Sequence, residues 1–169
     1  AMDMDGFIDW VLLEGYCANV DIKSNLRYFR TGDGPWQIAF YDLDWAFQTR
    51  SNCFFNLIGS EQTAQIAPTI RWLFGIDDFK ERLLARYAEL TETTLSDEHV
   101  TEKIDEFRTL LAPEIARERA RWGGSEKDWN EQVDALRANI ADDYAAHTVR
   151  NLCDALGVGE EERMEYFGF

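Results

Sequence analysis

The chain of 169 residues is poor in basic side chains: 17 Lys and Arg stand against 32 Asp and Glu, a formal net charge of −15. The basic residues are scattered and form no cluster. A surface of this sign repels polyanions, so we expect neither nucleic acid nor an anionic membrane surface as a partner. The excess of carboxylates suits divalent cations, although solubility alone accounts for most of the charges.

Cysteine and histidine are also scarce, with three and two residues. Cys17, Cys53 and Cys153 form no CxxC motif and have no neighbouring His at ligand spacing, which argues against a zinc site. Their odd number excludes a complete disulfide framework but leaves one bridge open. Neither His99 nor His147 belongs to a pattern that would suggest a triad with Ser or Cys.

Long apolar runs are missing as well. No segment reaches the roughly 20 apolar residues that cross a bilayer, so we expect no membrane span in this stretch. The chain also lacks a signal-peptide pattern. Hydrophobic residues nevertheless make up 46% of the chain and aromatic residues 14%. This composition predicts one globular domain over residues 1–169.

Helical periodicity dominates the pattern that is present. An apolar stripe predicts an amphipathic helix over about 5–18. Residues 50–69 are predicted to be a loop with short helical pieces, and everything after them is predicted to be helical. The later helices are expected at 69–74, at 77–91, at 96–122 with a break or kink at Pro113, and at 125–156.

One β-hairpin interrupts the helices. Segments 25–30 and 36–42 have strand character and flank a turn rich in Gly. A turn centred on Asp33 places Tyr28 opposite Ile38. The fold class is therefore mainly α with a small antiparallel β-hairpin (α+β).

Extending this register gathers four oxygen-bearing side chains at the open end of the hairpin: Asp21, Asn25, Asp42 and Asp44. A carboxylate that ends an apolar strand costs several kcal/mol to bury unless it is paired or bound to metal. Mg²⁺ and Mn²⁺ favour such oxygen ligands. In the alternative, these residues are ordinary turn and helix-end groups. That alternative predicts that Asp42 and Asp44 point into solvent and away from Asp21.

The order of these residues matches a phosphoryl-transfer site built on the protein-kinase plan. Such a site needs an Asp that accepts the proton of the substrate hydroxyl, then an Asn for metal, then a hairpin, then a metal-holding Asp. On this plan Asp21 is the catalytic residue, and Lys23 neutralises the transferred phosphate. Asn25, Asp42 and Asp44 then hold Mg²⁺ or Mn²⁺.

The chain resembles the CotH (spore coat protein H) kinase family, strongly up to Phe47 and more loosely beyond it. The residues that carry the resemblance are Phe7-Ile-Asp-Trp10, Asn19-Val-Asp21, Asn25, Tyr28-Phe-Arg30, Trp36, Tyr41-Asp-Leu-Asp44, Phe47, Arg121-Trp122 and Trp129. The resemblance implies an atypical protein kinase that uses ATP and a divalent metal to phosphorylate Ser or Thr of spore-coat, cell-surface or secreted bacterial proteins.

By the same resemblance, residues 1–169 are the C-terminal lobe of the kinase-like fold. Asp21 is then the catalytic Asp, while Asn25 and Asp42 contact the ATP–metal complex. The ATP-anchoring lobe, with its glycine-rich and lysine elements, is not among these residues, so we expect this stretch to be inactive alone and to need that lobe as a partner.

Two departures from the family pattern are visible. Gln48 stands where the family usually has Gly, and the interval of four from Asp21 to Asn25 is one shorter than in protein kinases. Gln48 also favours an alternative function, a non-catalytic, pseudokinase-like scaffold or binding module of a spore coat or cell surface.

Overall fold

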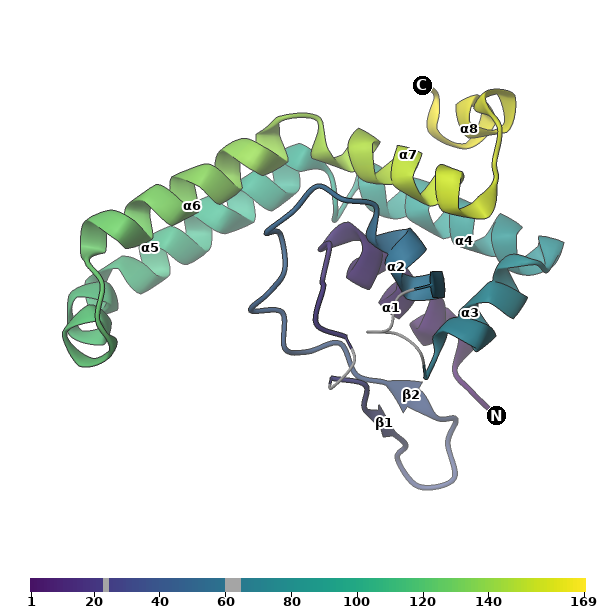
Figure 1. Ribbon diagram of the computed structural model, residues 1–169, viewed down its shortest axis with the longest axis horizontal. Helices are drawn as coiled ribbons and strands as arrows, with labels where there is room; N and C mark the ends of the chain where they lie inside the picture. Colours follow the sequence, from purple (N-terminus) through teal and green to yellow (C-terminus); the bar gives the residue numbers. More distant parts are fainter. Residues whose placement is uncertain (23–24, 60–64) are drawn as a thin grey trace. The chain divides into compact units, whose positions relative to one another are not determined.

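The computed structural model describes residues 1–22, 25–59 and 65–169, which are mainly helical (Figure 1). The elements of this part of the chain are α1 (Met4–Tyr16), β1 (Tyr28–Phe29), β2 (Gln37–Ile38), α2 (Cys53–Gly59), α3 (Ala67–Phe74), α4 (Asp77–Glu92), α5 (Asp97–Trp122), α6 (Glu126–Ala141), α7 (Tyr144–Leu156) and α8 (Glu160–Phe167). The prediction of a mainly α fold with one small antiparallel hairpin is confirmed. Among these helices, none has both the length and the apolar character that a bilayer crossing requires.

The chain divides into two compact units. One comprises Ala1–Glu89 and Thr148–Phe169, and the other comprises Leu90–His147. All of the site residues predicted from the sequence belong to the first unit.

Helix α1 lies in the core of the first unit. Its N-terminus is capped by Asp3, whose side chain accepts a hydrogen bond from the Gly6 N–H at 3.1 Å. The predicted apolar stripe is buried, since all of its residues are at most 3% exposed: Phe7, Ile8, Val11, Leu12 and Tyr16. Because most of its thirteen residues are buried or half-buried, α1 is a central helix and not a surface one.

Gly15 allows α2 to pack closely against α1. A Cβ atom at this position would lie 2.1 Å from the Phe54 ring. Phe54 is fully buried and meets the Tyr87 ring of α4 edge-on, with 5.9 Å between centroids. The Tyr87 hydroxyl in turn donates to Thr148 Oγ1 at 2.7 Å. Helices far apart in the sequence therefore meet around one aromatic side chain.

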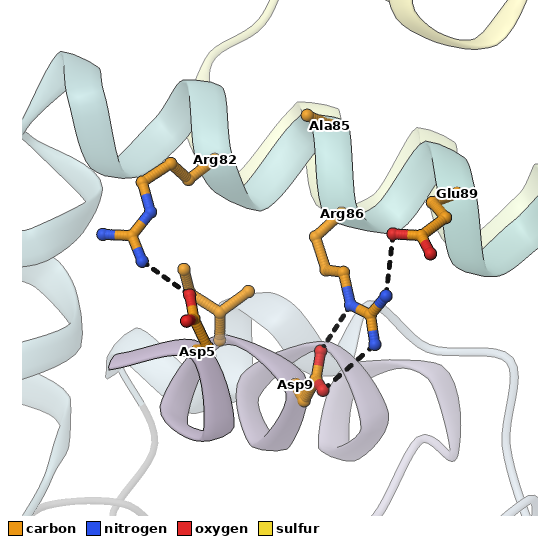
Figure 2. A pocket seen from close by; sticks show the side chains of 7 residues that line it. Asp5, Asp9, Arg82, Ala85, Arg86 and Glu89 are labelled. Atoms are coloured by element: carbon orange, nitrogen blue, oxygen red, sulfur yellow. Dashed lines mark hydrogen bonds and ion pairs between the residues drawn. The ribbon is translucent and has the colours of Figure 1, made fainter. Parts of the chain in front are cut away.

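Two ion pairs connect α1 to α4 (Figure 2). The Arg86 guanidinium donates to both carboxylate oxygens of Asp9, at 2.7 and 3.2 Å, and to Glu89 at 2.7 Å. The hydrogen bonds from Arg86 to Asp9 and Glu89 raise the pKa of Arg86 further above its ordinary value. Arg82 contacts Asp5 at 2.8 Å, but this pair is exposed and contributes little to stability. The half-buried, bidentate Asp9–Arg86 pair is therefore the principal polar contact between these helices.

The hairpin has the predicted register. Tyr28 lies opposite Ile38, and Phe29 lies opposite Gln37. The Ala39 N–H donates to the Arg27 carbonyl at 2.9 Å, which continues the same register toward the open end. The register prediction is therefore confirmed.

The strands are shorter than predicted, with two residues each in place of segments 25–30 and 36–42. Part of the reason is backbone conformation, because Asp42 has a left-handed φ of 63° that no extended strand adopts. In addition, the N–H and carbonyl of Trp36 are bonded to the N-terminal segment, each at 2.8 Å, and not to β1.

Three features of the later helices differ from the sequence prediction. Helix α5 continues through Pro113, which is exposed, so the carbonyl that loses its helical partner there can bond to water. The expected single helix over 125–156 is divided into α6 and α7, since Asp143 takes a left-handed φ of 55°. Helix α8 lies in the region predicted to be helical, but no separate helix was predicted there, because the glycines before it indicated only a stop.

The second unit contains a pair of long helices. Helices α5 and α6 lie side by side (Figure 1) and are joined by polar contacts on their facing sides. Arg137 donates to both Asp105 oxygens at 3.0 Å, and Arg108 donates to Asp134 at 2.6 Å. Ser125 starts α6 with the predicted capping box.

Gly15→Ala should destabilise the fold, because its methyl group would collide with the fully buried Phe54 ring. We expect a loss of roughly 2 kcal/mol or more in the free energy of unfolding. The matched control is Gly59→Ala in α2, where an added Cβ meets nothing within 4 Å. Urea denaturation of the two variants measures the difference, and equal midpoints would contradict the packing described here.

Candidate site at the C-terminal end of helix α1

Both acidic segments are attached at the C-terminal end of α1. The chain leaves the helix at Cys17, turns at Ala18 with a left-handed φ of 49°, and continues into the first acidic segment. The Cys17 carbonyl accepts a hydrogen bond from the Phe47 N–H at 2.7 Å. The Phe47 ring also meets the Tyr16 ring edge-on, with 6.1 Å between centroids. The second acidic segment is therefore attached to the helix end from which the first departs.

Asp21 and Asn25 are brought together in the first segment. The Asn25 side-chain amide donates to the Asp21 carbonyl at 2.9 Å and lies 3.5 Å from the Asp21 carboxylate. The Asn25 N–H donates to the Ile22 carbonyl at 3.0 Å, and the Ile22 side chain is buried. Because the amide nitrogen of Asn25 faces Asp21, its Oδ1 is the atom that would ligate a cation.

Asp42 and Asp44 are exposed. The burial cost that the sequence argument assigned to Asp42 is therefore wrong, because its left-handed backbone ends the strand and turns the residue to the surface. Exposure agrees with the surface-acid alternative, and it agrees equally with an open site that a nucleotide–metal complex can reach. The structure joins Asp21 to Asn25 but records no contact from either to Asp42 or Asp44 among the bonds described.

The oxygen atoms of the predicted ligands are of the types that bind hard divalent cations. The carboxylates of Asp42 and Asp44 and the amide oxygen of Asn25 are ligand types that Mg²⁺ and Mn²⁺ prefer. Over residues 1–22, 25–59 and 65–169, no three His, Cys, Asp or Glu side chains are gathered closely enough to hold a metal ion. The ligand roles of Asn25, Asp42 and Asp44 and the catalytic role of Asp21 stay predictions. Lys23, the other predicted catalytic residue, lies outside the described residues.

Sequence reasoning missed a buried polar pair that supports this site. Glu14 is 3% exposed and Asn19 is 1% exposed. The Asn19 amide nitrogen donates to Glu14 Oε2 at 2.9 Å, and the Asn19 Oδ1 accepts from the Asp21 N–H at 3.1 Å. One signal was available in the sequence. Glu14 follows Trp10 by four residues and Val11 by three, so a carboxylate stands on a face otherwise apolar.

Burial dominates the electrostatics around α1. It raises the pKa of the Glu14 carboxyl to about 7, while hydrogen bonds from Asn19 and Trp10 act in the opposite direction. Burial, with a smaller contribution from the Glu14 charge, raises the pKa of the Cys17 thiol to about 12. Cys53 and Cys153 are also buried and free, and their pKa values are likewise raised by desolvation. None of the three thiols is therefore an activated nucleophile.

The described elements place the Asp–Asn segment, the hairpin and the Asp–Leu–Asp segment in this order on a mainly helical scaffold. The family model described as CotH kinase protein matches residues 1–145, and the chain belongs to this family. The match includes α1 to α6, and with them every residue of the candidate site. Neither a curated protein nor a solved structure matches the chain.

The raised pKa of Glu14 predicts a pH dependence of stability. The folded chain keeps the Glu14 proton up to a pH of about 7, whereas the ordinary value of 4.5 applies when the chain is unfolded. The folded state therefore binds the proton more tightly, and the free energy of unfolding falls as pH rises from below 4.5 through about 7.

Glu14→Gln should remove this contribution, which is on the order of 2 kcal/mol between pH 5 and 8. Urea denaturation at the two pH values measures it. Glu161→Gln, at an exposed position in α8, is the control and should keep the pH dependence of the wild type. If the free energy of unfolding of Glu14→Gln depended on pH as strongly as that of the wild type, the explanation by Glu14 burial would be ruled out.

Proposed function

We propose that residues 1–169 are the C-terminal lobe of an atypical protein kinase of the CotH family, which acts together with an ATP-anchoring lobe. The reaction is in-line transfer of the γ-phosphoryl group of ATP to a Ser or Thr hydroxyl of a protein, in the family's setting a spore-coat, surface or secreted one. The observation that carries the proposal is the common attachment of both acidic segments to the C-terminal end of α1, through the Phe47–Cys17 hydrogen bond and the hydrogen bonds from Asn19 to Glu14.

In this proposal Asp21 orients the substrate hydroxyl and accepts its proton. Its backbone is held from both sides, since Asn19 accepts from its N–H and Asn25 donates to its carbonyl. Backbone fixation of this kind keeps a catalytic carboxylate in the geometry that proton transfer needs. Lys23, two residues further along the chain, supplies positive charge to the transferred phosphate.

Asn25, Asp42 and Asp44 are the proposed ligands of Mg²⁺ or Mn²⁺, with Asn25 and Asp42 closest to the ATP phosphates. A divalent ion bound there would neutralise negative charge on the phosphate oxygens. The exposure of Asp42 and Asp44 leaves these carboxylates accessible to a nucleotide carried by the other lobe.

A non-catalytic scaffold or binding module of a spore coat or cell surface is the second candidate, and Gln48 favours it. The Gln48 side-chain amide lies 3.5 Å from the Asp44 carbonyl, so it borders the turn that carries the proposed ligands. A Gly at this position would leave that turn freer to adjust around a metal ion. In a scaffold, the acidic turn would serve only as a surface.

Phosphotransfer by the complete protein tests the first candidate. Asp21→Asn removes the proton acceptor and should lower the rate by about 10²–10⁴-fold. Asp42→Asn removes a metal ligand and should also abolish most of the rate. Asp33→Asn, in the exposed turn at the opposite end of the hairpin, is the control and should retain it. Wild-type rates in both site variants would refute the assignment.

Manganese binding separates the two candidates without an activity assay. Titration of the chain with Mn²⁺, followed by electron paramagnetic resonance, should show a site that Asp42→Asn and Asp44→Asn each weaken by at least ~10-fold, the cost of losing even an outer-sphere partner. The larger loss identifies the main ligand. If the complete protein binds no Mn²⁺ or Mg²⁺, the scaffold is the better assignment.

A further inference from the structure

We propose that Glu14 is a positioning residue for the Asp21 segment: its buried carboxylate orients the Asn19 amide, and that amide holds the backbone N–H of Asp21. The importance of Asp21 for phosphoryl transfer rests on the proposed function. The connection from Glu14 to Asp21 rests only on the contacts of α1 and the segment that follows it.

The burial of Glu14 is hard to explain by stability alone. An ionised carboxylate at 3% exposure is costly unless it is paired, and an apolar side chain of similar volume is often at least as stable in such a position. The side chains that donate hydrogen bonds to it, Trp10 and Asn19, are neutral. The Glu14 charge in turn contributes to the raised pKa values of the Cys17 thiol and of the Cys53 thiol in α2. Glu14 therefore contributes a hydrogen-bond acceptor at one defined position.

Asn19 uses both ends of its amide. The nitrogen donates to Glu14 Oε2 at 2.9 Å, and the oxygen accepts from the Asp21 N–H at 3.1 Å. The Asn19 backbone N–H also donates to the Glu14 carbonyl at 3.2 Å. Because the side chain is buried and its nitrogen is directed to Glu14, the oxygen must face Asp21. Removing the acceptor on Glu14 would leave the amide without this orientation.

The consequence reaches Asp21 directly. Its N–H is held by Asn19, and its carbonyl is held by Asn25 at 2.9 Å. Only the first of these two bonds connects Asp21 to a fully buried side chain, since Asn19 is 1% exposed whereas Asn25 is half-buried. Glu14 thus connects the interior of the first unit to the backbone from which the Asp21 carboxylate projects.

Amide hydrogen exchange of this chain, measured by NMR, tests the proposal without reference to catalysis. Glu14→Met keeps the volume and removes the acceptor, so the Asp21 amide should exchange about three- to tenfold faster, as expected for one lost neutral hydrogen bond. Glu14→Gln retains an acceptor and should stay within about twofold of wild type. Amides of the α5–α6 pair should not change in either variant.

Asn19→Ala supplies the second arm, because it removes the same bond from the other side. If Glu14 acts through Asn19, the double variant Glu14→Met/Asn19→Ala should exchange at the Asp21 amide no faster than Asn19→Ala alone. The NMR chemical shift of the Asp21 amide should also change with pH around a midpoint near 7, because the pKa of the Glu14 carboxyl is raised to about 7. This change should be absent in Glu14→Gln.

An unchanged Asp21 amide in Glu14→Met, or additive effects in the double variant, would overturn the proposal. A purely structural Glu14 would alter the urea midpoint and leave the Asp21 amide and its titration as in wild type. The failure of the kinase assignment is recognised separately, because wild-type phosphotransfer by Asp21→Asn would leave every one of these exchange results as it is.

Discussion

The hydrogen bond from the Phe47 N–H to the Cys17 carbonyl is the contact on which the candidate site depends. Carbonyls in the last turn of a helix have no partner within the helix, and α1 satisfies this one with a residue from beyond the hairpin. The chain must therefore pass through the Asn19–Asn25 segment, form the hairpin and return to the same helix end. The edge-on contact of the Tyr16 and Phe47 rings adds an aromatic contact to this hydrogen bond.

Several features near the C-terminal end of α1 lower the stability of the first unit. Glu14 places a carboxylate in the core, and Ala18, Asp42 and Phe47 all adopt left-handed backbone conformations that L-residues seldom take. Such departures from local preference concentrate at functional sites, where the surrounding packing compensates for them. Here the compensation comes from the apolar burial of α1 and from the packing of Phe54 into the space left by Gly15.

Part of this structure could be predicted from the sequence. The stripe from Phe7 to Tyr16 predicted α1, and the turn around Asp33 predicted the pairing of Tyr28 with Ile38, because both signals are local and periodic. The division between α6 and α7 could not be predicted, because the break falls at Asp142 and Asp143, where the sequence has no Gly or Pro that would indicate a helix end. The role of Glu14 was missed for a related reason: an acid on a helix is usually solvated, and only distant segments bury it.

The sequence by itself determined the helical class, the hairpin register and the order of Asp21, Asn25, Asp42 and Asp44, and its motifs carried the CotH resemblance. Only the tertiary structure decided that Asp42 and Asp44 are exposed, that Phe47 returns to Cys17 and that Glu14 is buried beside Asn19. Periodicity and turn chemistry act over a few neighbouring residues, so a sequence displays them directly. Burial and hydrogen bonding across the hairpin depend on segments that meet only after the chain has folded.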